Sequence, residues 1–138
     1  MAKILVCDDE DLQLKICARA FMELGHRVYG VKTPEETLRE IQKSRYDLVV
    51  IDLQNLCGDD RFAYGEYQDG GDRIKRDWRE KIKRMRPEVR VVAMTNYPLG
   101  SVSDAFNHFD DVWDKWDFHL TKDGKRTKLE NLLIKQGI

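Results

Sequence analysis

Three aspartates at the ends of apolar runs are the residues most able to do chemistry in this sequence. Asp8 and Asp9 follow the first run (ILVCDDE), and Asp52 lies at the end of a later one (DLVVIDL). If the two runs are neighbouring parallel strands, the three carboxylates meet at one edge of a sheet. Like charges about 5 Å apart repel by roughly 3 kcal/mol at an effective dielectric constant near 20, so such a cluster needs a cation or a proton. The pattern therefore predicts a pocket for a hard metal ion.

The elements that would position these acids alternate between strand and helix. Short β-branched runs without polar alternation are typical of strands buried on both faces of a parallel sheet, and they occupy residues 4–7, 48–53 and 89–94, with weaker candidates at 26–31 and 112–118. Helical spacing and capping residues predict helices over 12–24, from Thr33-Pro34-Glu35-Glu36 through 41, from near 71 to 87, after Ser101, and around 129–133.

This alternation predicts an α/β fold, a parallel sheet with helices on both faces and right-handed crossovers. Ligands of such sheets bind beyond the carboxyl ends of the strands. Thr95 and Lys115 fall at strand ends together with the three aspartates. These five positions are the candidate site.

Composition limits the other possibilities. A length of 138 residues predicts one domain, 1–138, and 24 basic against 25 acidic residues give no reason to expect a nucleic-acid or membrane partner. Three cysteines without a CxxC pair fit a reducing compartment, and no apolar run is long enough for a signal peptide or a membrane span. These features predict a cytoplasmic protein.

Four motifs in order resemble the receiver domain of bacterial two-component response regulators of the chemotaxis-regulator type: ILVCDDE, DLVVIDL, VVAMTN and a lysine in the fifth strand. The resemblance covers almost the whole chain. It implies a flavodoxin-like, doubly wound sheet of five parallel strands in the order 2-1-3-4-5. It also implies that Asp52 is the phosphoacceptor, that Asp8 and Asp9 help hold Mg²⁺, that Thr95 contacts the phosphoryl oxygens, and that Lys115 pairs with the phosphoaspartate.

These implied roles are chemically reasonable. Aspartate is a weak nucleophile, so its phosphorylation depends on positioning and on neutralising the phosphoryl oxygens, which Mg²⁺ and Lys115 would do. Magnesium prefers oxygen ligands, and Asp9, Asp52 and the backbone carbonyl of Gln54 suit it, with Asp8 acting partly through water. The resemblance implies a sensor histidine kinase or phosphotransfer protein as donor, an unidentified downstream protein as partner, and no enzyme activity beyond the domain's own phosphorylation and dephosphorylation. The alternative is an interaction module of the same fold that is not phosphorylated.

Ordinary structural roles remain open for the same residues. Acids after a strand often cap the next helix, as Asp9 or Asp11 would here. Thr95 is equally compatible with a turn, and Lys115 with a solvated charge pair to its acidic sequence neighbours.

The segment 54–70 is the largest departure from the family pattern. It is longer than the family's loop by roughly ten residues and lacks its usual proline, and long loops in compact domains are often functional or disordered. We predict that residues 56–69, with Phe62, Tyr64 and Tyr67, fold over the pocket as a lid; a loop without fixed structure is the alternative.

The fifth strand departs from the pattern twice. Trp116 follows the lysine where the family has a proline in a cis peptide, and a non-proline cis bond costs about 2.5–4 kcal/mol. Either the bond is trans and the loop moves, or the fold is strained. Val112, with Trp113 beside it, stands where the family has its switch aromatic, so the usual threonine–aromatic pair is incomplete here.

Other functional classes have less support. The three histidines form no ligand spacing, and no serine lies in a nucleophile elbow. A phosphotransferase of the haloacid dehalogenase type is discounted because Gln54 occupies the second acid's position in its DxD motif. The basic helix RIKRDWREKIKRMR is interpreted as a solvated face, and Cys7 as a small buried hydrophobe.

Overall fold

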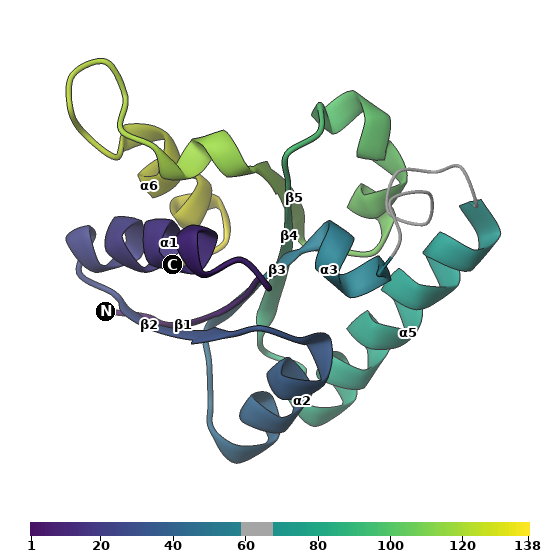
Figure 1. Cartoon of the computed structure of the whole chain (residues 1–138). Helices are drawn as coiled ribbons and strands as arrows, with labels where there is room; N and C mark the ends of the chain where they lie inside the picture. Colours follow the sequence, from purple (N-terminus) through teal and green to yellow (C-terminus); the bar gives the residue numbers. More distant parts are fainter. Residues whose placement is uncertain (59–67) are drawn as a thin grey trace.

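The protein is built around one five-stranded parallel sheet (Figure 1). The computed structural model describes the backbone of residues 1–58 and 68–138, and their side chains except at 68–72 and 101–103. The strand order is β2-β1-β3-β4-β5, with bounds β1 (Lys3–Cys7), β2 (Arg27–Val31), β3 (Leu48–Asp52), β4 (Arg90–Thr95) and β5 (Asp111–Asp114). This confirms the predicted fold class and strand order.

Helices cover both faces of this sheet. One face carries α2 (Pro34–Lys43), α3 (Leu53–Cys57), α5 (Gln68–Met85) and the 3₁₀ helix η1 (Leu99–Asn107), and the other carries α1 (Asp11–Glu23), the 3₁₀ helix η2 (Lys115–Phe118) and α6 (Thr127–Lys135). Successive residues of the central strands point into opposite apolar cores, which explains why these strands lack polar alternation. Within the described residues, no helix is both long and apolar enough to span a membrane.

Two helix predictions are confirmed in detail. The Thr33 hydroxyl accepts a hydrogen bond from the Glu36 backbone N–H at 3.1 Å, with Pro34 in the first turn of α2. Helix α5 buries Trp78 and Ile82 against the sheet, as its spacing predicts, although it begins a few residues before 71.

The segment after β5 differs from the prediction, because the strand ends at Asp114 instead of continuing to 118. A reciprocal capping box ends it: the Asp114 carboxylate accepts from the Trp116 N–H at 2.9 Å, and the Asp117 carboxylate accepts from the Asp114 N–H at 3.1 Å. These contacts turn the chain into η2 immediately after the strand.

Two further elements were predicted wrongly or missed. The helix expected after Ser101 is a 3₁₀ helix that begins at Leu99. Helix α3 was expected to be loop. Asp52 caps it by accepting from the Asn55 N–H at 3.2 Å, and Gly58 ends it in the left-handed region at φ 70°.

Candidate functional site

The parallel register brings the predicted site residues to one edge of the sheet. Asp52 and Thr95 are the last residues of β3 and β4, and Asp8 and Lys115 directly follow β1 and β5. Neighbouring strands are paired so that these ends lie level with one another. The sequence prediction that the carboxylates meet at the carboxyl edge is therefore confirmed for Asp8 and Asp52.

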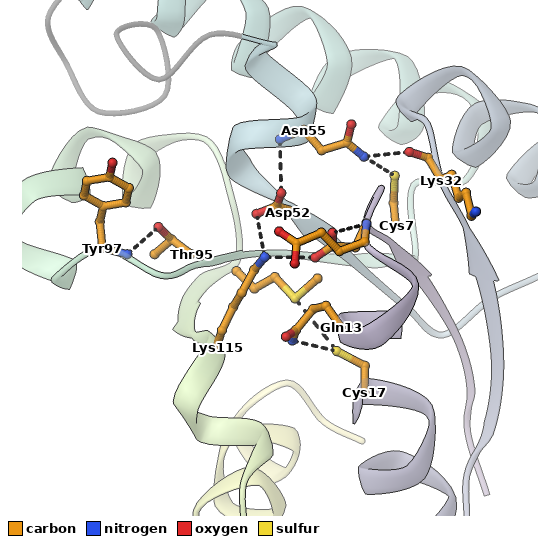
Figure 2. A network of polar contacts seen from close by, with 12 residues as sticks. Cys7, Gln13, Cys17, Lys32, Asp52, Asn55, Thr95, Tyr97 and Lys115 are labelled. Atoms are coloured by element: carbon orange, nitrogen blue, oxygen red, sulfur yellow. Dashed lines mark hydrogen bonds and ion pairs between the residues drawn. The ribbon is translucent and has the colours of Figure 1, made fainter. Parts of the chain in front are cut away.

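Lys115 lies between the buried carboxylates of Asp8 and Asp52, and Figure 2 shows its contact with Asp52. Its Nζ lies 2.9 Å from Asp8 Oδ2 and 3.3 Å from Asp52 Oδ1. The side chains of the lysine and the two aspartates are only 7%, 0% and 6% exposed, respectively. The alternative of a solvated pair with the neighbouring acids is therefore wrong, because those acids instead cap η2.

The cluster holds two carboxylates and one ammonium group away from water. Burial raises the pKa of Asp52 to about 6; Lys115 opposes this rise and Asp8 adds to it. Burial also raises the pKa of Asp8. Burial alone would lower the pKa of Lys115, but Asp52 and Asp8 together raise it above its ordinary value. When both carboxylates are ionised, two negative charges face one positive charge, and a bound cation would neutralise the excess.

A small cavity opens beside this cluster. It has a volume of about 190 Å³ and is lined by Asp9, Glu10, Gln54, Asn55 and Gly58. One carboxylate oxygen from each of Asp8, Asp9 and Glu10 lies within 4.8 Å of the others. The predicted ligands Asp9 and Gln54 therefore share one cavity, and this oxygen-rich set fits a hard cation such as Mg²⁺. Glu10 was not among the predicted ligands, although its place in the DDE motif was the signal for it.

Asn55 is a second residue that sequence reasoning missed. Its backbone N–H donates to Asp52, and its side-chain amide donates to the Lys32 carbonyl at 2.8 Å and to Cys7 Sγ at 3.5 Å. It thereby ties α3 to the β2–α2 connection and to β1 (Figure 2). Burial raises the pKa of the Cys7 thiol to about 12, which agrees with its interpretation as a small buried hydrophobe.

The capping alternative for the acids after β1 is wrong. Glu10 stands at the N-cap of α1 and makes no side-chain capping bond. Asp9 is exposed, and Asp11 forms an ion pair with Lys32 at 2.8 Å. Asp8 Oδ1 accepts from the Glu10 N–H at 2.9 Å, so it stabilises the turn before α1 while its other oxygen contacts Lys115.

Thr95 is buried, and its hydroxyl oxygen accepts from the Tyr97 N–H at 3.1 Å. This contact supports the turn interpretation. The strand register also places Thr95 next to the end of β3, so its predicted phosphoryl contact stays a prediction.

The departures in the fifth strand have a simple structural outcome. No peptide bond in the described residues is cis, so the bond before Trp116 is trans and the capping box redirects the chain. Trp116 is exposed, whereas Val112 and Trp113 are buried in opposite cores. The predicted lid over residues 56–69 falls mostly outside the described residues.

The whole chain has the fold of response regulator receiver domains. No protein-family model matches the sequence, and no curated protein matches it significantly. Among solved structures, a BeF₃-activated DrrB receiver domain is 27% identical, with a TM-score of 0.62, and the match covers 99% of this chain and 97% of that one. A CheY-like receiver domain from Methylobacillus flagellatus is 18% identical, with a TM-score of 0.68 and coverage of 99% and 98%.

TrrA from Thermotoga maritima, solved in complex with Mg²⁺ and beryllium fluoride, is 18% identical, with a TM-score of 0.66 and coverage of 99% of both chains. The acidic group of Asp8, Asp9 and Glu10 resembles the receiver active site.

The raised pKa of Asp52 predicts how the stability of the metal-free protein depends on pH. The pKa of Asp52 in the folded protein, about 6, exceeds its ordinary value of 3.8. The folded state therefore loses stability as pH rises from 3.8 to about 6, and above pH 6 the full cost of the buried charge is present. In EDTA at pH 7.5, Asp52→Asn should therefore raise the free energy of unfolding by about 3 kcal/mol. The gain should shrink towards pH 4. Urea denaturation at several pH values measures it, and a gain independent of pH would contradict the stated cause.

Proposed function

We propose that residues 1–138 form a single receiver domain of two-component signalling whose Asp52 accepts a phosphoryl group from a sensor histidine kinase or a phosphotransfer protein. The observation that carries this proposal is the pairing of buried Asp52 with Lys115 at 3.3 Å, at the strand edge where an acid-lined cavity opens. A buried carboxylate paired with a buried ammonium group beside a cavity combines a nucleophile with a cation that can stabilise negative charge on a transferred group.

The transfer step follows from this geometry. A carboxylate oxygen of Asp52 attacks the phosphorus atom of a phosphohistidine, the P–N bond breaks, and the electron pair leaves with the imidazole. The product is an aspartyl phosphate. Above its pKa of about 6, Asp52 is ionised and needs no base to remove a proton. We assign Lys115 and the Thr95 hydroxyl as the groups that contact the phosphoryl oxygens.

Magnesium belongs to this proposal because the cavity offers it hard ligands. Asp9 and the backbone carbonyl of Gln54 would hold it from the cavity, where Glu10 adds a carboxylate. Asp8 and Asp52, which share Lys115 beside the cavity, would complete the set. When bound, the ion neutralises negative charge on the transferring group and on the clustered acids. Signalling then passes to a downstream protein through contacts of the phosphorylated domain.

Metal binding gives a separate prediction. Asp9→Ala should weaken Mg²⁺ binding at least tenfold, because it removes an exposed carboxylate from the cavity and reduces the local negative charge. The exposed Asp77→Ala on α5, whose side chain is 54% exposed, is the matched control. Titration followed by intrinsic tryptophan fluorescence or by calorimetry measures both affinities. Equal affinity in wild type and Asp9→Ala would place the metal elsewhere.

The phosphorylation proposal is tested with the whole chain. Incubation with Mg²⁺ and acetyl phosphate should add the mass of one phosphoryl group, and EDTA should prevent the addition. A chain that gains no mass from acetyl phosphate or from phosphorylated histidine kinases would favour the non-phosphorylated interaction module.

A further inference from the structure

A groove between α2 and α5 lies away from the acidic site. It has a volume of about 380 Å³ and is lined by Leu38, Arg39, Gln42, Lys81, Arg84 and Met85. Each helix connects two parallel strands, so each runs from the carboxyl edge of the sheet back to the amino edge. The lining residues come from the middle and C-terminal part of α2 and from the C-terminal end of α5, and the two helices lie side by side (Figure 1). The groove is therefore displaced towards the amino edge, opposite the carboxylates.

The lining combines an apolar floor with a positive rim. Leu38 and Met85 are half-buried and pack against the core, whereas Arg39, Lys81 and Arg84 are exposed. The lining contains no acidic residue. The groove thus offers apolar surface and positive charge in one place.

The three cations are available for a partner. Each has an acid four residues earlier on its own helix, Glu35, Asp77 or Glu80. The structure nevertheless gives none of the three an ion pair within the described part of the chain, and Asp77 pairs with Arg76 instead. Exposed ion pairs at this spacing are weak, so contacts of the three cations with these acids would compete little with a partner's carboxylates.

We propose that this groove binds an acidic, amphipathic segment of a partner protein. One large apolar side chain of the segment seats on Leu38 and Met85, and flanking carboxylates pair with Arg39, Lys81 and Arg84. The lining spans about one helical turn on each side, roughly 6 Å, which fits one anchor residue and its neighbours. The apolar floor favours such a segment over nucleic acid, because binding a phosphate backbone requires more cationic side chains along a longer surface. This inference does not rest on phosphorylation of Asp52.

A binding experiment tests the proposal. Fluorescein-labelled peptides with four glutamates flanking one Leu, Ile, Phe or Trp are titrated with the intact chain and followed by anisotropy. At least one should bind, with affinity falling as salt rises. Replacing its anchor by Ser should weaken binding several-fold, and replacing its glutamates by lysines should abolish it.

Charge reversal on the protein locates the site. Arg39→Glu with Arg84→Glu should weaken binding more than tenfold, whereas Lys122→Glu with Lys125→Glu, which changes net charge equally at exposed positions, should change it less than threefold. If the first double variant does not fold by circular dichroism, Gln42→Glu should still weaken binding several-fold. Asp52→Asn should bind the anchor peptide with the same affinity as wild type.

Three results of the binding titrations would overturn the proposal. They are no binding by any anchor peptide at 1 mM, equal affinity of the Ser peptide and its anchor parent, and equal losses of affinity in the two double variants. The second would indicate a site for polyanions in general, and the third a response to overall charge. Amide chemical shifts in the ¹⁵N-labelled chain should change at 38–42 and 81–85, and changes confined to other regions would equally contradict the groove.

Discussion

Asp52→Asn is expected to abolish phosphorylation of the chain by acetyl phosphate or by a phosphorylated kinase. Asparagine keeps the size of the side chain, and its single amide oxygen can replace one of the two Asp52 oxygens, the one that accepts from the Asn55 N–H or the one that contacts Lys115. It lacks the anionic oxygen that forms the acyl phosphate, so the fold should persist while the mass increase disappears. Intact-mass spectrometry of the two proteins, treated in parallel with Mg²⁺, measures the effect.

Asp77→Asn is a suitable control for this variant, since it makes the same chemical change on the exposed side of α5. The control should gain one phosphoryl group, as wild type does. A mass gain that survives in Asp52→Asn would show that another side chain accepts the phosphoryl group, and the proposed role of Asp52 would be wrong.

Lys115→Met should cause the largest loss of stability at the site. The substitution keeps much of the side chain's length but leaves Asp8 and Asp52 buried without their shared cation. Removing one partner of a buried ion pair costs about 3–5 kcal/mol. Lys115 lowers the pKa of both acids in the wild type, so their pKa values should rise further in the variant. The loss should therefore grow as pH rises through the carboxylate range.

Urea denaturation in EDTA at several pH values measures this loss. Lys128→Met is the matched control, because Lys128 contacts Asp117 at 2.7 Å but is 65% exposed, and it should cost no more than about 1 kcal/mol. Added Mg²⁺ should restore part of the stability of Lys115→Met by supplying the missing positive charge. Similar losses in the two variants would contradict a specific role for the buried lysine.

The sheet and the position of the site were predictable from sequence because both follow from a few strong regularities. Strands buried on both faces need continuous apolar runs, so 4–7, 48–53 and 89–94 predicted β1, β3 and β4 to within a residue or two. Parallel pairing then aligns the strand ends, which is why Asp8, Asp52 and Lys115 were expected to meet.

The missed elements depend on single hydrogen bonds that periodicity does not reveal. Helix α3 is only five residues long, too short for a helical repeat, and it depends on capping by Asp52 and on Gly58. The end of β5 depends on the reciprocal contacts of Asp114 and Asp117, whereas its apolar pattern continues to 118. Glu10 and Asn55 were missed for the same reason, because their positions in the site follow from local turns.

Chemical trapping of the modified residue shows directly whether Asp52 is the phosphoacceptor. The chain is incubated with Mg²⁺ and acetyl phosphate and then treated with borohydride, which reduces an aspartyl phosphate to homoserine. Peptide mass spectrometry then locates the changed residue. We expect homoserine at position 52 alone, and no conversion when EDTA replaces Mg²⁺. Conversion at Asp8 or Asp9, or none anywhere in a sample that has gained phosphoryl mass, would contradict the role of Asp52 as phosphoacceptor.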